Sequence, residues 1–144
     1  MKAVFACVGA GLALASCVVI NDRSTDAARM QQAKEAPQVR GALSGRRQLI
    51  ASFYATAPDC TSLGYPTLIV ARPPQHGHAS VEQGTALAGF GKDDARNVCN
   101  GRSVPATLIY YTSEPGFIGA DSVAFERIGV AGAYGYHDYT INVR

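Results

Sequence analysis

The chain has 144 residues, of which 47% are hydrophobic, and its formal net charge at pH 7 is +2. This length suits one domain with short extensions, and 15 Gly and 7 Tyr without any Trp favour a β-rich domain. Beyond residue 48, eight acidic residues outnumber six basic ones, which argues against nucleic acid as a partner.

Residues 1–16 predict a signal peptide. Lys2 precedes an apolar run over residues 3–13, and this run is shorter than the about 20 residues that a membrane-spanning helix needs. The residues that follow are Leu14, Ala15, Ser16 and Cys17. They resemble the lipobox of bacterial lipoproteins, which implies that residues 1–16 are removed and that Cys17 carries lipid. The alternative is an ordinary cleaved signal peptide.

Lipid on Cys17 would make the bilayer the first partner of this chain. Two or more acyl chains hold a protein stably on a membrane, so such a protein is anchored rather than spanning. Val18 follows the cysteine, whereas an Asp at that position favours retention of lipoproteins in the inner membrane. The resemblance therefore implies the periplasmic face of the cell outer membrane.

Two cysteines remain once Cys7 leaves with the signal peptide and Cys17 is acylated. Because the periplasm is oxidising, Cys60 and Cys99 are predicted to form a disulfide. This bond would close a loop of about 40 residues and stabilise the fold by about 4 kcal/mol in the chain-entropy model. A metal site is the weaker interpretation, since the sequence contains no C-x-x-C pair.

Residues 17–47 are predicted to be a lipidated N-terminus and polar tether. From residue 18 onward they hold six basic and three acidic residues. Residues 24–36 suit a short helix that Pro37 ends, although an isolated helix of this length is marginal in water. Two interpretations stay open for the basic charge: a solvated linker, or a segment that lies on anionic lipid or peptidoglycan.

Residues 48–144 predict an all-β domain, an Ig-like two-sheet antiparallel β-sandwich of about six or seven strands. The expected strands lie at residues 49–55, 67–71, 78–83, 106–112, 123–126 and 139–143. Residues 84–101 are expected to be an irregular stretch that has room for one edge strand. The apolar run at residues 67–71 suits a buried, central strand. The clearest alternation is the last, in which Tyr139, Ile141 and Val143 face one side.

A second resemblance rests on a motif within residues 111–125. The motif consists of Tyr111, Thr112, Pro115, Gly116, Phe117, Gly119, Asp121, Ser122, Val123 and Phe125. It is similar to the pattern of bacterial Ig-like and cadherin-like repeats, and the likeness extends over residues 67–144. The resemblance implies the sandwich fold. The single copy and the cysteine pair depart from that family, so its array-type adhesion is not implied.

Three histidines are the candidate metal ligands. His76 and His78 would lie on one hairpin and share a face, and with His137 they suit a copper or zinc site. A polar turn and an exposed final strand are the stronger interpretation. Calcium is disfavoured too, because it needs six to eight oxygen ligands, and Asp121 is expected to cap a turn instead.

Tyrosines give the better binding candidates, namely Tyr110, Tyr134 and Tyr136, because tyrosine is enriched at interfaces; ordinary packing is the alternative.

The sequence has no nucleophile elbow, Walker loop or H-E-x-x-H motif, so we expect a protein that is not an enzyme and uses no cofactor. The prediction is a binding or assembly module for an envelope protein or peptidoglycan. The alternatives are an inhibitor or accessory factor of a peptidoglycan-acting enzyme, and a periplasmic metal-binding protein.

Overall fold

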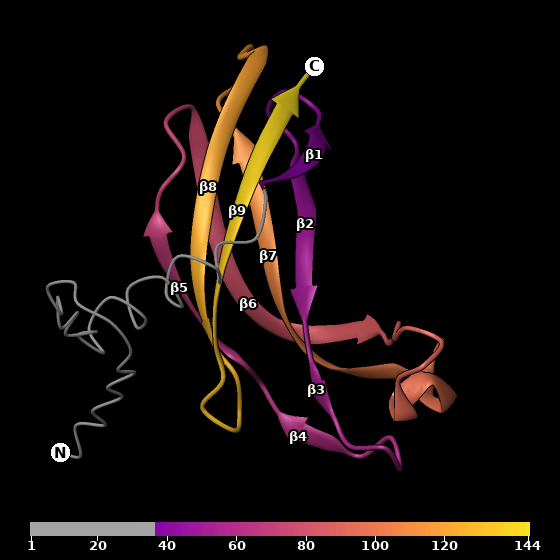
Figure 1. Cartoon of the computed structure of the whole chain (residues 1–144). Coiled ribbons are helices and arrows are strands. Elements are labelled where there is room, and N and C mark those ends of the chain that lie inside the picture. The colour runs from indigo at the N-terminus through magenta and orange to yellow at the C-terminus, as the bar shows by residue number, and fades with distance from the viewer. Residues whose placement is uncertain (1–36) are drawn as a thin grey trace, which may run out of the picture. The chain divides into compact units, whose positions relative to one another are not determined.

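The computed structural model describes residues 37–144, which form strands and one short 3-10 helix (Figure 1). The elements are β1 (Gln38–Ala42), β2 (Arg47–Phe53), β3 (Ala55–Thr56), β4 (Ser62–Gly64), β5 (Thr67–Arg72), β6 (Gly77–Leu87), η1 (Ala95–Cys99), β7 (Ser103–Ser113), β8 (Gly119–Ile128) and β9 (Tyr134–Val143). The predicted all-β fold is confirmed. The predicted signal peptide, the predicted lipidation residue Cys17 and the predicted tether up to residue 36 lie outside the described residues. Within residues 37–144, no helix has the length and apolarity to cross a bilayer.

Two sheets form the sandwich. The four-stranded sheet has the order β1-β9-β8-β5, and the three-stranded sheet has the order β2-β7-β6. Neighbouring strands are antiparallel, except that β1 runs parallel to β9. The chain changes sheets between β1 and β2, between β2 and β5, between β5 and β6, and between β7 and β8, so both sheets contain strands from distant parts of the chain, as in Ig-like sandwiches. These strands agree with the predicted number, and β3 and β4 form a separate two-stranded ribbon.

The main core lies between the sheets. Ile109 of β7, Phe125 of β8 and Ile141 of β9 are fully buried in it, and so is Tyr111. The alternation predicted for β9 is confirmed, because its inward side chains, Tyr139 among them, are buried. Burying one side chain of this size contributes about 1.5–3 kcal/mol, so β7, β8 and β9 provide most of the framework.

The sandwich begins earlier than the sequence predicted. The expected boundary lies at residue 48, but β1 takes Gln38–Ala42 from the predicted tether and pairs with Tyr139–Val143 at the edge of β9. Only Ala42 is buried in this strand, so no hydrophobic alternation marks it. Backbone pairing forms it instead, and the Arg40 guanidinium lies over the Tyr139 ring at 5.3 Å from the ring centroid.

The position of β5 corrects a second expectation. Its apolar sequence predicts a central strand, yet β5 is the last strand of the four-stranded sheet. The Ile69 side chain is 48% exposed and Val70 is 38% exposed. A continuous apolar run looks the same in a central strand and in an apolar edge strand, and so the pattern alone does not separate them.

The predicted Cys60–Cys99 disulfide is present, with Cα atoms 5.4 Å apart. It joins the turn between β3 and β4 to η1. The edge strand allowed within the irregular stretch is the end of β6, which continues to Leu87 before η1 begins. Cys99 packs with Ala88 and Val104 in a second, smaller core. The 3-10 helix η1, which ends at Cys99, lies at this end of the β6–β7 pair (Figure 1).

Candidate functional site: the isoleucine–tyrosine face

Two of the three predicted tyrosines lie together on the outer face of the four-stranded sheet. Tyr134 and Tyr136 are two residues apart on β9, so their side chains point to the same side. Tyr134 pairs with Ile128 of β8, while Tyr136 pairs with Glu126, which in turn pairs with Ile69 of β5. These five residues are called the isoleucine–tyrosine face below.

The apolar members of this face are open to solvent. Tyr134 is 57% exposed, Ile128 is 42% exposed and Ile69 is similarly exposed, whereas Val123 and Phe125 of β8 point inward and are fully buried. Contiguous exposed apolar groups mark interaction surfaces, and tyrosine is enriched there. The sequence reasoning found the tyrosines but missed both isoleucines, because one lay in a predicted buried strand and the other beyond a predicted strand end.

The face has negative character. Partial desolvation, together with the charge and hydrogen bonding of Glu126, raises the pKa of Tyr134 above its ordinary value, so the tyrosine keeps its proton at neutral pH. The next row of paired residues across the sheet contains Arg72, Ala124 and Asp138. In this row Arg72 Nη2 donates to Asp138 Oδ1 at 2.5 Å. The charges of Arg72 and Asp138 offset each other, so Glu126 gives the face its net negative charge.

Apolar surface continues from the face to β4. Val130 lies in the turn of the β8–β9 hairpin, and a Cβ placed on Gly64 of β4 would be 3.6 Å from its Cγ1 atom. Leu63, Tyr65 and Val130 are all exposed, and the hairpin lies close to β4 in Figure 1. The exposed apolar region therefore spans β4, β5 and the hairpin.

Tyr110 lies on the other sheet, so the structure does not bring it together with Tyr134 and Tyr136. Arg47 covers its ring, with the guanidinium carbon 3.4 Å from the ring centroid. The same guanidinium donates to Glu82 Oε1 at 2.5 Å. The ring is thus engaged within the chain, which makes Tyr110 a weaker candidate for binding.

The three histidines of the weaker, metal-binding interpretation are not arranged as a metal site in the described part of the chain. His76 stacks on Phe117, with ring centroids 4.2 Å apart. His137 of β9 contacts Phe53 of β2 in a tilted ring pair, with centroids 4.6 Å apart, and His78 lies on β6. Among residues 37–144 no group of three or more His, Cys, Asp or Glu side chains is arranged to hold a metal ion. His76 and His137 are engaged in ring contacts within the chain, so their arrangement gives the metal-binding alternative no support.

Asp121 caps a turn, as expected, and it does so from inside the sandwich. Its buried carboxylate accepts hydrogen bonds from the backbone N–H groups of Gln75, His76 and Ser122 at 2.9, 3.0 and 2.8 Å. The Tyr111 hydroxyl donates a fourth, at 2.9 Å. Burial by itself would raise the pKa of the Asp121 carboxyl, but these four hydrogen bonds outweigh burial and lower it. Burial and Asp121 together raise the pKa of Tyr111, so it remains a donor.

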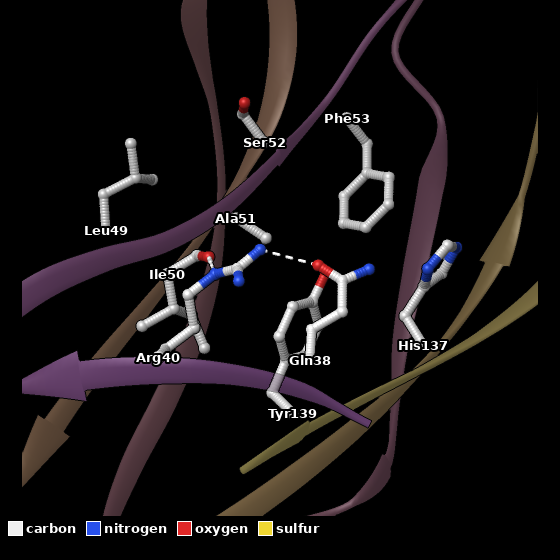
Figure 2. Close-up of a pocket in the computed structure, with 9 residues that line it drawn as sticks. All are labelled: Gln38, Arg40, Leu49, Ile50, Ala51, Ser52, Phe53, His137 and Tyr139. Atoms are coloured by element: carbon white, nitrogen blue, oxygen red, sulfur yellow. Dashed lines mark hydrogen bonds between the residues drawn. The ribbon is translucent and has the colours of Figure 1, made fainter. Parts of the chain in front are cut away.

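A groove of about 470 Å³ lies between β1, β2 and β9 (Figure 2). Arg40, which lines the groove, is already engaged within the chain. Its Nε donates to Ile50 O at 2.8 Å, and its Nη2 donates to Gln38 Oε1 at 2.6 Å. Phe53 and Tyr139 complete the walls. With its polar groups held in this way, the groove is a weaker candidate site than the isoleucine–tyrosine face.

Comparison with known proteins places the chain in no family: no family model matches it, and no curated protein does. A solved structure with limited similarity is a nucleoside hydrolase-related hypothetical protein from Saccharophagus degradans that is associated with carbohydrate metabolism. The identity is 18% and the TM-score is 0.27. The match covers 77% of this chain and 23% of that protein.

Proposed function

We propose that this chain is a lipid-anchored binding or assembly module of the cell envelope, held by acylated Cys17 at the periplasmic face of the outer membrane. It binds an envelope protein or peptidoglycan and catalyses no reaction. The observation that carries the proposal is the isoleucine–tyrosine face, where exposed aliphatic and aromatic side chains lie on the outer side of a sheet whose inner side packs in the main core.

The disulfide supports the compartment. Disulfides persist in oxidising compartments such as the periplasm and are rare in the cytosol. The Cys60–Cys99 bond uses the two cysteines that remain after export and acylation. Export through a lipoprotein signal and a stable disulfide therefore agree with each other.

Binding is tested with the full chain, purified in detergent, against isolated peptidoglycan and against solubilised envelope proteins. Tyr134→Ser combined with Ile128→Ser should weaken binding about tenfold or more, because buried aromatic and aliphatic anchors dominate interfaces. Leu87→Ser is the matched control, since Leu87 is also an exposed aliphatic residue but lies outside the face. Equal binding by wild type and the double variant would contradict the proposed site. A wild type that binds neither material but blocks a peptidoglycan-cleaving enzyme would replace this function by the inhibitor alternative.

The anchor has its own test. Cys17→Ser should move the protein from the membrane fraction to the soluble fraction, and mass spectrometry of the wild type should show added acyl chains. A Cys17→Ser protein that stays with the membrane would contradict anchoring through this residue.

A further inference from the structure

The two main sheets end in four edge strands, β1 and β5 in one sheet and β2 and β6 in the other. An edge strand presents backbone N–H and C=O groups that can pair with an added strand. Proteins prevent such pairing with charged side chains, prolines, bulges or short strands. The four edges of this sandwich differ in that protection.

Three of the edges are protected. A bulge between Leu49 and Ala51 interrupts β2, and Arg40 Nε donates to the Ile50 carbonyl oxygen beside it. The short strand β1 carries Arg40 itself. Polar side chains, among them Glu82, follow the length of β6.

Within residues 37–144, nothing protects the β5 edge over most of its length. Residues 67–71 contain neither a charged residue nor a proline, and both Ile69 and Val70 are substantially exposed. The bulge in β5 comes only between Val70 and Arg72, at its end. This edge therefore offers apolar side chains toward both faces of the sheet.

β5 is also held in place at its ends. Before the strand, Thr107 Oγ1 donates to the Pro66 carbonyl oxygen at 2.7 Å, in a buried position. At its end Arg72 is bonded to Asp138, and Asp121 fixes the segment that follows. A strand that is already ordered loses little further conformational freedom when it gains a partner.

The charge of the face defines the partner. Side chains of an added strand would alternate between the two faces of the sheet, so every second one would lie beside Ile69 on the outer face. Glu126 is one strand further in, about 10 Å from the added backbone at the usual strand spacing. Long basic side chains reach toward such a carboxylate, and an acidic one would be repelled. The residues between them would lie beside Leu68 and Val70 and should be aliphatic.

We propose that the β5 edge binds an extended polypeptide segment of alternating basic and aliphatic residues, which joins the four-stranded sheet as an additional strand. The inference rests on the proposed binding function and names the chemistry of a partner for the same region. Backbone pairing would give affinity, and the face around Glu126 would give selectivity.

The test uses hydrogen exchange on the full chain in detergent, with a short peptide of alternating Lys and Val as the probe. The peptide should slow exchange at amides of β5 and leave those of β6 unchanged. An alternating Glu and Val peptide should bind about tenfold more weakly, and Glu126→Gln should weaken the Lys–Val peptide about two- to fivefold, as for an exposed ion pair. Ile69→Lys, a charge on the edge, should abolish the protection, whereas Leu87→Lys should not.

Several results would overturn the inference. These are the absence of new protection in β5, equal affinity for the acidic and basic peptides, or a peptide-free protein that is dimeric with β5 already protected. The last result would assign the edge to a second copy of the chain. If Ile69→Lys retains binding to envelope material that Tyr134→Ser with Ile128→Ser loses, the edge inference fails while the proposed function stands.

Discussion

Tyr111→Phe removes a single hydroxyl from the interior and leaves the ring in place. That hydroxyl donates one of the four hydrogen bonds that the buried Asp121 carboxylate accepts. A hydrogen bond to a charged group contributes about 1.5–3 kcal/mol net, so we expect the free energy of unfolding to fall by about 2 kcal/mol. Asp121→Ala leaves all four donors without their acceptor and should cost about 4–5 kcal/mol, which is close to the whole stability of a marginal domain.

Urea unfolding followed by circular dichroism measures these losses, with Tyr110→Phe as the matched control. Tyr110 neighbours Tyr111 on β7 but points outward, so its variant should change stability by less than about 0.5 kcal/mol. A double-mutant cycle compares wild type, Asp121→Asn, Tyr111→Phe and the variant with both changes. We expect a coupling free energy of about 1 kcal/mol or more between the two positions. Equal stabilities of the two tyrosine variants, or additive losses in the cycle, would refute the assignment of Asp121 as a shared buried acceptor.

The same carboxylate gives a pH dependence of known sign. The folded pKa of Asp121 lies below its unfolded value. Its stabilisation is therefore complete above about pH 5 and is lost as the pH falls through the folded pKa. The Asp121→Asn variant has no carboxyl group at this position, so it does not titrate there. The difference in unfolding free energy between wild type and Asp121→Asn should narrow steadily below about pH 4, and a constant difference would contradict the lowered pKa.

Two further predictions concern the framework. Replacing both Cys60 and Cys99 by serine should reduce the free energy of unfolding by about 4 kcal/mol and make stability insensitive to reductant. Equal stability of this variant and the oxidised wild type would contradict a structural role of the disulfide. Gly77→Ala should destabilise by about 1–3 kcal/mol, because its new Cβ would lie 2.5 Å from the Thr112 carbonyl oxygen. Gly41→Ala is the control, as no atom lies within 4 Å of its Cβ position, and a similar loss in both variants would rule out steric crowding as the cause.

The fold was predictable where side-chain alternation reports burial directly. In β9, Tyr139 and Ile141 point inward, and the sequence alternates in step with them. The same reasoning failed for β1, whose Gln38–Ala42 segment pairs through its backbone and buries one residue. It also failed for β5, because an apolar run gives no sign of whether a neighbour strand lies on one side or on both. Edge and centre are decided by topology, which residues elsewhere in the chain determine.

The candidate site was predictable in part for a related reason. Period-two spacing places Tyr134 and Tyr136 on one side of their strand, and the structure agrees. Ile128 lies on the preceding strand, β8, while Ile69 lies on β5, after which the chain crosses to the other sheet and back before it reaches β9. Only the pairing register therefore brings the two isoleucines beside the tyrosines. Tyr110 has the same residue type but lies on the other sheet. Residue type thus proposes candidates, while register decides which of them form one surface.

The Asp121 hydrogen bonds connect stability to the β5 edge. Two of their donors, Gln75 and His76, belong to the segment that carries the chain from β5 to β6. Weakening the acceptor should therefore loosen the end of β5 before it loosens β9, which is paired on both sides along its second half. We expect Asp121→Asn to speed hydrogen exchange more at residues 67–72 than at Tyr139–Val143, under conditions where the variant remains folded. It should also weaken the Lys–Val peptide, because part of the binding free energy would go into ordering the strand. Equal acceleration in both strands would show that the Asp121 cluster supports the whole sandwich and has no particular hold on β5.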